Sequence, residues 1–275
     1  MNKKYLATVI VALCAVSLQA QDNNILRHYS LSGGVGTTGF TVDVGTMFTD
    51  FIGIRGGIDY LHNIKYGEDL DLSYVYDDLD NADIEIPDYI DVSAVPTEVA
   101  VQGKLDSFTG HALLDIYPFK KVGFHLTVGA YFAQKDNIVT VYNRKEGSLK
   151  MVADFNARRG DFEGIPASYG QVAAQLGGYS IKPDDNGNAS AYINVKKVRP
   201  YVGLGFGRAV PKTSRMNCQF DMGVQFWDTP MVYNGVNGEQ LSVDSAKGDG
   251  SGVLRAISKI KVYPVISVRV SGRLF

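Results

Sequence analysis

Cysteine, long apolar runs and an excess of positive charge are scarce or missing in this sequence. The 275 residues include two cysteines, Cys14 and Cys218, and Cys14 lies in a segment that we expect to be cleaved, so no intramolecular disulfide is predicted. The formal net charge of −2 provides no basic surface for nucleic acid. After the N-terminal segment, no stretch has the roughly 18 consecutive apolar residues of a transmembrane helix.

The residue types that are abundant point to strands. The chain holds 30 glycines, 16 tyrosines and 13 phenylalanines, and 45% of it is hydrophobic against 20% charged. That balance excludes an intrinsically disordered chain. Glycine and aromatic residues without long apolar runs favour many strands joined by turns over a helical bundle.

The N-terminal segment has the features of a secretory signal peptide. Two lysines precede the apolar stretch YLATVIVALCAV, and the small residue Ala20 ends the following SLQA. We predict cleavage before Gln21, because the apolar stretch is too short for a transmembrane anchor. Loss of the two lysines changes the net charge from −2 to −4. The chain then consists of a signal peptide, 1–20, and one domain, 21–275.

Export without a disulfide or an apolar helix leaves two classes, a soluble periplasmic domain and an outer-membrane β-barrel. Apolar and polar residues alternate in seven segments, as strands with two different faces do. In GFTVDVGTMF, for example, Phe40 and Val42 share one face and Asp43 lies on the other. The segments are 39–48, 52–60, 108–116, 124–132, 201–207, 216–226 and 266–271.

The content of the polar face favours the barrel. It mixes Gly, Asp, Arg and His with few of the Lys and Glu residues that cover a solvated sheet. In a transmembrane barrel the apolar face meets lipid, and the small, polar face lines the interior. Closure pairs every backbone group without water, so strands of about 9–11 residues can cross a bilayer. We therefore predict an all-β fold, a closed antiparallel up-and-down transmembrane β-barrel.

The lengths of the connections predict the strand count and the orientation. Short and long connections alternate, as expected of periplasmic turns and long external loops. Since single-chain bacterial barrels have an even number of strands, LRHYSLSGG at 26–34 is predicted to be the eighth. The short connections are 49–50, 117–123 and 208–215, and the long ones are about 66–97, 143–190 and 235–258.

Four stretches resemble the small outer-membrane β-barrel proteins of Gram-negative bacteria. They are TVDVGTMFTDFIGIRGGIDYL, LLDIYPFKKVGFHLTVGAYF, RPYVGLGFG and the terminal YPVISVRVSGRLF. The class includes OmpA-like and OmpW-like eight-stranded barrels, and SLQAQ is similar to Bacteroidetes cleavage regions. The resemblance implies a place in the cell outer membrane, with outer-membrane lipid, lipopolysaccharide and the barrel-assembly machinery as partners. It does not name an activity, because the fold hosts unrelated functions.

The resemblance also implies a role for the C-terminal aromatic residue. In such proteins a terminal aromatic is part of the signal that the assembly machinery reads, and Phe275 matches that position. Apolar residues are expected at alternate positions counted back from it. Arg273, Ser271 and Arg269 stand there instead, so the apolar set is shifted by one residue.

Charged residues on the predicted interior face are candidates for ion pairs. Charges in a narrow lumen are costly unless they are paired, and Arg forks suit carboxylates. We predict a ladder of ion pairs that plugs the lumen, with a gated polar pore as the alternative. The candidates are Asp43, Arg55, Asp59, Asp115, Arg199, Asp221, Arg269 and Arg273.

Two histidines and an acidic segment are further candidates. His111 and His125 are expected to face inward on adjacent strands as a hydrogen-bonded pair, with a metal or acid–base site as the alternative. The segment 66–98 holds eleven Asp or Glu and no Lys or Arg. Clustered oxygens can bind Ca²⁺, but no EF-hand spacing occurs, so we predict no metal. Its interleaved tyrosines make it a candidate surface for a partner, and a solvated loop repelled from lipopolysaccharide is the other interpretation.

Motifs for catalysis are missing. The sequence has no serine elbow, phosphate loop or zinc motif, and His62 with Asp59 or Glu68 is the one faint acid–base candidate. We predict a non-enzymatic outer-membrane protein without a cofactor, structural or surface-interacting in role. The alternative is a small, porin-like channel or a transporter for small or hydrophobic solutes. A lipid-modifying enzyme is a weaker third possibility.

Overall fold

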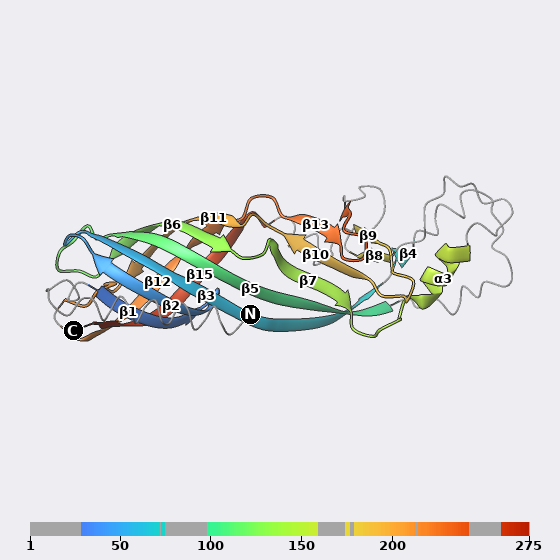
Figure 1. The fold of residues 1–275 in the computed structure, drawn as a ribbon, viewed down its shortest axis with the longest axis horizontal. Coiled ribbons are helices and arrows are strands. Elements are labelled where there is room, and N and C mark those ends of the chain that lie inside the picture. Colours follow the sequence, from blue (N-terminus) through green and yellow to red (C-terminus); the bar gives the residue numbers. More distant parts are fainter. Residues whose placement is uncertain are drawn as a thin grey trace.

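The computed structural model describes residues 29–71, 73–74, 98–158, 174–176, 179–212, 214–241 and 260–274 (Figure 1). The predicted signal peptide and Phe275 lie outside these ranges. Most of the described chain is antiparallel β-structure, and the described ranges include one α-helix, α3 (Lys150–Arg158). The strands are β1 (Tyr29–Gly36), β2 (Gly39–Met47), β3 (Ile52–Asp71), β4 (Ser73–Tyr74), β5 (Glu98–Ile116), β6 (His125–Ala133), β7 (Asn137–Asn143), β8 (Ala174–Leu176), β9 (Tyr179–Ile181), β10 (Ser190–Asn194), β11 (Val198–Phe206), β12 (Met216–Phe226), β13 (Met231–Asn234), β14 (Gln240–Leu241) and β15 (Val262–Arg273).

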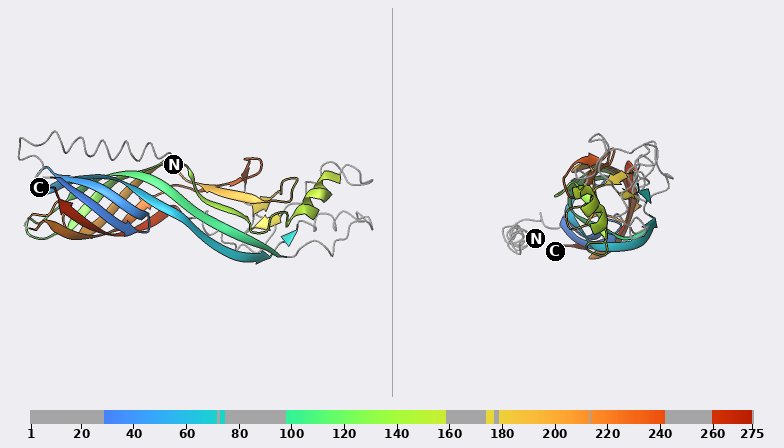
Figure 2. Two further views of the ribbon diagram at one scale, coloured as in Figure 1. Left: turned by 60° about the horizontal axis from the view of Figure 1, so that its bottom comes forward. Right: turned by 90° about the vertical axis from the view of Figure 1, so that its right-hand side faces the viewer.

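Eight of these strands pair in a ring. The pairing runs from β1 through β2, β3, β5, β6, β11 and β12 to β15. β15 in turn pairs with β1, from Ser30 opposite Arg273 to Gly36 opposite Ser267. All of these pairings are antiparallel, and Figure 2 shows the strands wound around a common axis. At one end of the ring the connections are short, at 48–51, 117–124 and 207–215.

At the other end, β3 and β5 continue far beyond the ring. They have 20 and 19 residues, and a 20-residue strand is about 66 Å long, roughly twice the 30 Å of a bilayer's hydrocarbon core. A β-bulge between Leu61 and Ile64, with Asn63 at a φ of 44°, marks the point where β3 leaves the ring and enters the outer part of the sheet. β7, β10, β13 and β14 widen the same sheet outward from β5 (Figure 1). We call this outer part, together with α3, the extension.

The prediction that 66–97, 143–190 and 235–258 are loops is therefore wrong in part. β3 continues to Asp71 and is followed by β4. Within 143–190 lie α3, β8 and β9, and within 235–258 lies β14. The physical reason is that β5 keeps hydrogen-bonded partners beyond the ring, β3 on one edge and β7 on the other. The sheet also covers an apolar core of its own, formed by Val101, Leu149, Val152, Tyr179, Ile181, Ala189, Ala191, Ile193 and Val232.

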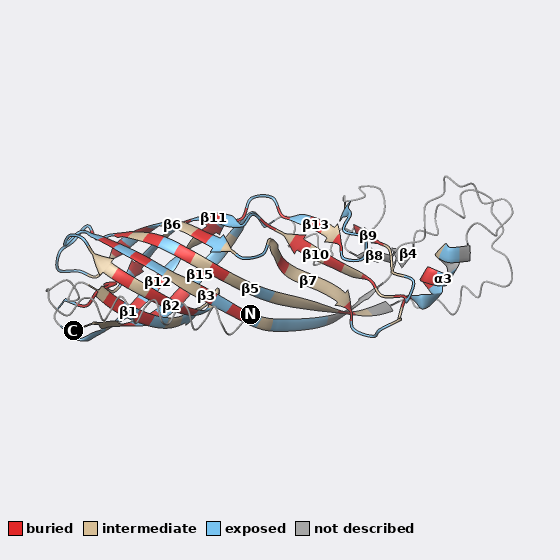
Figure 3. Ribbon diagram, viewed as in Figure 1, coloured by how far each residue is buried: buried red, intermediate tan, exposed pale blue. Residues whose placement is uncertain are grey.

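Burial in the ring is inverted relative to a water-soluble sheet (Figure 3). Inward side chains such as Asp43, Asp115 and His125 are fully buried, whereas outward Phe40 is 66% exposed. Within the described ranges, no helix is long and apolar enough to cross a membrane. The large exposed apolar side chains of the ring are Leu31, Val35, Phe40, Val42, Ile52, Ile54, Tyr60, Ile116, Leu126, Val128, Phe132, Val198, Val202, Leu204, Phe206, Met216, Phe220, Met222, Phe226, Val262, Ile266, Val268 and Val270.

The pairing of β1 with β15 can be tested by cross-linking. Ser32 lies opposite Ser271, and directly opposed residues have Cα atoms about 4.5–5.5 Å apart, within the range of a disulfide. In a Cys218→Ser background, Ser32→Cys with Ser271→Cys should form a disulfide, seen as altered mobility of the denatured chain that reductant reverses. Ser32→Cys with Ser267→Cys is the control, because Ser267 lies opposite Gly36, four residues away. Equal cross-linking of both pairs would contradict the register.

Candidate functional site

The lumen of the ring holds a cluster of charged side chains, and Arg55 on β3 is at its centre. The Arg55 guanidinium lies 2.5 Å from Asp115 through Nε, and its Nη2 donates to the other oxygen of that carboxylate at 2.8 Å. Nη2 also donates to Asp221 on β12 at 3.0 Å. Thr127 on β6 donates to Asp115 at 2.8 Å. Arg55 thus connects strands on opposite sides of the ring while it is only 1% exposed.

Arg269 on β15 makes a second connection, between the adjacent strand β12 and β2, which lies beyond β1. Its Nη1 donates to Asp43 on β2 at 2.8 Å, and its Nη2 is ion-paired with Asp221. Asp221 therefore receives both arginines. Because these groups are buried, each pair is held in surroundings where an unpaired charge is costly.

The two histidines join the cluster at different aspartates rather than pairing with each other. His111 places Nε2 2.8 Å from Asp43 and Nδ1 2.6 Å from Asp59. His125 places Nε2 3.0 Å from Asp221 and Nδ1 3.1 Å from the carbonyl of Gly123. All four ring nitrogens thus face acceptor oxygens.

The cluster brings together four acidic and four basic side chains. His111 Nδ1 is hydrogen-bonded to Asp59 and both His125 nitrogens are hydrogen-bonded, whereas His111 Nε2 lies within ion-pair distance of Asp43 without hydrogen-bond geometry. Two guanidinium groups and two imidazoles thus face four carboxyl groups. The cluster, which we call the lumen network, consists of Asp43, Arg55, Asp59, His111, Asp115, His125, Asp221 and Arg269.

Apolar side chains fill the lumen beside the network. Tyr131 and Tyr201 lie edge to face, with ring centroids 5.4 Å apart, and both pack with Leu113 and Val265. Toward the extension, Tyr263 contacts this cluster and stacks on Trp227 at 4.6 Å.

The turn at 207–215 folds back into the end of the ring that has the short connections. We call this end the short-turn mouth. The backbone N–H of Ala209 donates to the Tyr117 hydroxyl at 2.9 Å, and Ser30 donates to the Ala209 carbonyl at 2.7 Å. Arg208 lies 4.8 Å from the Tyr117 ring and donates to the Lys120 carbonyl at 2.7 Å. Ala209 and Tyr117 are fully buried, so this mouth is filled by protein.

An ion pair on the outside of the same mouth joins two turns. Lys212 donates to Asp50 at 2.6 Å. This hydrogen bond and the positive charge of Lys212 lower the pKa of the exposed Asp50 carboxyl.

Two of the predicted ion-pair residues lie elsewhere. Arg199 is buried at the extension end of β11, where it donates to the Lys196 carbonyl at 3.0 Å and is not ion-paired within the described residues. The Tyr201 hydroxyl lies over the inward glycines Gly203 and Gly223. Arg273 lies at the rim of the short-turn end, where it donates to the Lys212 carbonyl at 3.0 Å.

The remaining candidates show no catalytic or metal-binding arrangement among the residues that are described. His62 is exposed and its Nδ1 lies 2.8 Å from the Tyr60 hydroxyl, while Asp59 is turned inward to His111. No group of three or more His, Cys, Asp or Glu in the described ranges could hold a metal ion. Most of the acidic segment 66–98 lies outside those ranges.

Sequence reasoning missed several lumen residues. Thr127 and Tyr131 stand at inward positions of an alternating segment, so strand parity could have found them. Tyr117 directly follows β5 and continues the alternation that makes Leu113 and Asp115 point inward. Arg208 lies in a connection, where alternation does not apply and no other signal in the sequence marks it. Trp227 directly follows β12, at a position where the alternation of that strand turns the side chain inward.

Inward glycines make room for the large charged side chains. A Cβ atom at Gly34 would collide with the Arg269 side chain, and one at Gly57 would collide with Asp43. Outward Gly33, by contrast, has nothing within 4 Å of that position. The abundance of glycine is thus partly explained by the width of the lumen.

Removing one member of a buried ion pair should cost more than removing both. Arg55→Met leaves Asp115 uncompensated and should lower the free energy of unfolding by about 3–5 kcal/mol. The double variant Arg55→Met/Asp115→Leu should cost at least about 1 kcal/mol less than the sum of the single variants. Urea unfolding in lipid vesicles, followed by fluorescence of the single tryptophan, measures this.

The exposed pair Lys197–Asp136 is the matched control, with side chains 57% and 49% exposed. Lys197→Met and Asp136→Leu should couple by no more than about 1 kcal/mol. Additive effects at Arg55 and Asp115 would show that the pair does not act as a unit.

Adjacent glycines on β1 should respond oppositely to the same substitution. Gly34→Val displaces Arg269 and should lower the free energy of unfolding by about 1–3 kcal/mol. Gly33→Val adds an apolar group to the outer face and should leave stability unchanged or higher. Urea midpoints of the two variants in the same vesicles give the comparison, and similar losses at both positions would refute the close approach at Gly34.

Comparison with known proteins does not assign a family. No family model matches the chain, and no curated protein matches it. Two similar solved structures are crystal structures from Acinetobacter baumannii. CarO2 is 15% identical with a TM-score of 0.45, covering 90% of this chain and 98% of CarO2. CarO is 14% identical with a TM-score of 0.47, covering 92% of this chain and 100% of CarO. A likeness of this degree carries no conclusion about activity.

Proposed function

We propose that the eight-stranded ring is a closed β-barrel in the outer membrane of a Gram-negative bacterium, with a plugged lumen and a structural or surface-interaction role. The observation that carries the proposal is the inverted burial of the ring. Its outer face is apolar on every strand, and its inner face holds the lumen network. Full burial of one Val, Leu, Ile or Phe side chain is worth about 1.5–3 kcal/mol, so water is a poor solvent for this surface and lipid a good one.

The outer membrane is the bilayer that fits the remaining features. The predicted signal peptide implies export, and lipid requires every backbone group to be paired within the protein. Pairing of β15 with β1 meets that requirement, because the ring then has no free edge. Outer-membrane lipid and lipopolysaccharide would surround the ring, and the assembly machinery would read its C-terminal end.

The plugged lumen rests on three obstacles in series. The lumen network bridges opposite strands, the Tyr131–Tyr201 cluster fills the space beside it, and Arg208 with Ala209 fills the short-turn mouth. An ion that crossed would have to separate buried ion pairs. This arrangement supports a structural role over a porin-like channel.

A non-enzymatic role fits the same arrangement. His111 and His125 are 5% and 0% exposed and are held by aspartates, so a substrate has no access to them. The extension is the part that projects beyond a bilayer's thickness. With the acidic segment 66–98, it is the surface that we propose for a partner outside the cell.

Extraction and reconstitution test the proposal together. Protein from the outer-membrane fraction should migrate faster in SDS gels when it is unboiled, because a closed barrel resists the detergent. In planar bilayers it should give no conductance steps. Arg55→Ala should stay silent too, because the obstacle at Arg208 remains.

A porin reconstituted in parallel shows that insertion would be detected. Recovery of the protein as a soluble periplasmic product would refute the barrel. Conductance steps from the wild-type protein would leave the barrel standing but would replace the plugged lumen with the channel alternative.

A further inference from the structure

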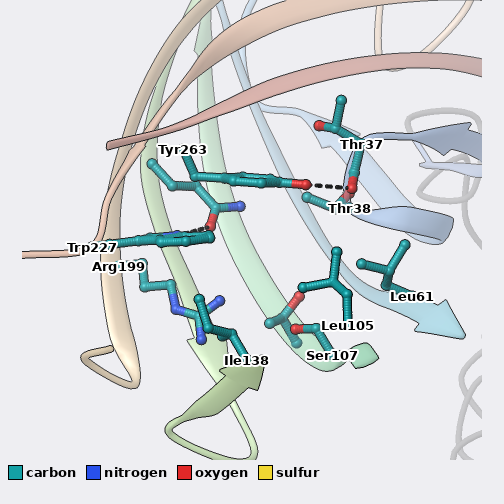
Figure 4. A pocket seen from close by; sticks show the side chains of 11 residues that line it. Thr37, Thr38, Leu61, Leu105, Ser107, Ile138, Arg199, Trp227 and Tyr263 are labelled. Atoms are coloured by element: carbon teal, nitrogen blue, oxygen red, sulfur yellow. Dashed lines mark hydrogen bonds between the residues drawn. The ribbon is translucent and has the colours of Figure 1, made fainter. Parts of the chain in front are cut away.

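Two pockets flank residues 106–108 of β5, where the pairing partner of that strand changes from β6 to β7. The inner pocket lies against Trp227 and Tyr263 and has a volume of about 30 Å³, which leaves room for one or two waters (Figure 4). The outer pocket has a volume of about 350 Å³, within the range of about 300–1,000 Å³ that is usual for small-molecule sites. Of the two, the outer pocket is the one that can hold a ligand larger than water.

Polar side chains from β5, from β7 and from the connection between β6 and β7 line the outer pocket. The side chains from β5 stand at outward positions, on the same face as the exposed Ile116. The Gln134 N–H in the connection donates to the Phe108 carbonyl at 3.1 Å, which holds the connection against β5. The outer pocket thus opens on the outside of the ring. Its charged and hydrogen-bonding side chains include Lys104, Asp106, Gln134, Lys135 and Thr140.

Three lysines bring positive charge to the outer pocket. Lys104 and Lys135 line it. Lys65 on β3 stands directly opposite Lys104 in the pairing of β3 with β5. Like charges in directly opposed positions repel each other, so an anion bound beside them would stabilise the sheet here.

Carboxylates offset only part of this charge. Asp106 lies 3.6 Å from Lys104, and Asp136 is engaged by Lys197 at 3.0 Å. The other two lysines of the group form no ion pair within the described ranges. An anion at the outer pocket would therefore meet two positive charges that no described carboxylate balances.

Aromatic side chains place the outer pocket at the edge of the apolar band. Tyr60 and Phe108 line the pocket on the side of the ring, with ring centroids 6.5 Å apart. From Ile52 to Tyr60, β3 has about the 9–11 residues that a strand needs to cross a bilayer. Exposed aromatic residues form girdles at the two interfaces of a membrane barrel. At the extension end of the ring these are Phe40, Tyr60, Phe132 and Phe226.

We propose that the outer pocket binds the phosphorylated sugar headgroup of lipopolysaccharide. The phosphate accepts hydrogen bonds from Lys104 and Lys135, whose ammonium groups bind phosphate as point charges. Gln134 and Thr140 offer an amide and a hydroxyl to the sugar, and the acyl chains lie along Tyr60 and the apolar face below it. The inference rests on the proposed place of the ring in the outer membrane and adds a specific lipid site to it.

Native mass spectrometry of the purified full-length mature protein in detergent measures this binding, because a bound lipid adds its own mass. Diphosphoryl lipid A should bind at least about tenfold more tightly than lipid A without phosphates, since anionic groups are attracted to each lysine. It should exceed phosphatidylglycerol, an anionic lipid without the sugar, by a similar factor. Lys104→Gln/Lys135→Gln should weaken the binding of diphosphoryl lipid A at least about tenfold.

Lys120→Gln/Lys121→Gln is the matched control, because it removes the same charge from exposed side chains at the short-turn mouth. This control should bind diphosphoryl lipid A as the wild type does. Thr140→Trp keeps the lysines and fills the outer pocket, so it too should weaken binding at least about tenfold. Faster migration of the unboiled protein in SDS gels shows that each variant has folded.

Equal binding of lipid A with and without phosphates would overturn the proposal, and so would equal binding of phosphatidylglycerol. Unchanged binding in either folded pocket variant, or an equal loss in the Lys120/Lys121 control, would do the same. A heat-modifiable wild-type protein with any of these results keeps the barrel and loses only the lipid site. Recovery as a soluble periplasmic product would instead refute the barrel and the site together.

Discussion

Four aspartates, two arginines and two histidines are buried together in one lumen, where a charge without a partner is costly. Each of these aspartates lies within ion-pair distance of an arginine or a histidine. The rest of the ring is built around this requirement. Glycines stand where the large side chains need space, and threonines supply the remaining hydrogen bonds, as Thr41 does to Asp59 at 2.6 Å.

The outer face follows from the inner one. In a strand, alternate side chains point to opposite faces, so packing the polar residues into the lumen turns the apolar residues outward. The arrangement with polar residues inside and apolar residues outside ends at the bulge between Leu61 and Ile64. Beyond it, the same two strands belong to a sheet that packs an apolar core against α3, as a water-soluble protein does.

The sequence allowed the ring to be predicted, because alternation is a local signal. It also placed Asp43, Arg55 and Asp221 on one face. It could not say which charges meet, since that depends on register around the whole ring. Arg199 and Arg273 stand at inward-facing positions of their strands, but each lies too near an end of its strand to reach the lumen network. The extension was missed because its short strands, such as β13, carry too few residues for a clear period.

The position of Arg269 bears on how the molecule folds. It lies on β15, which closes the ring by pairing with β1, and its partner Asp43 is 226 residues away, so this contact has the high sequence separation that slows folding. Until β15 docks, Asp43 and Asp221 lack one of their cations. An incomplete ring therefore carries uncompensated negative charge as well as open edges. Pairing of β15 with β1 and β12 removes both defects in one step. The closed ring therefore differs from an incomplete one in its charge balance as well as in its strand pairing.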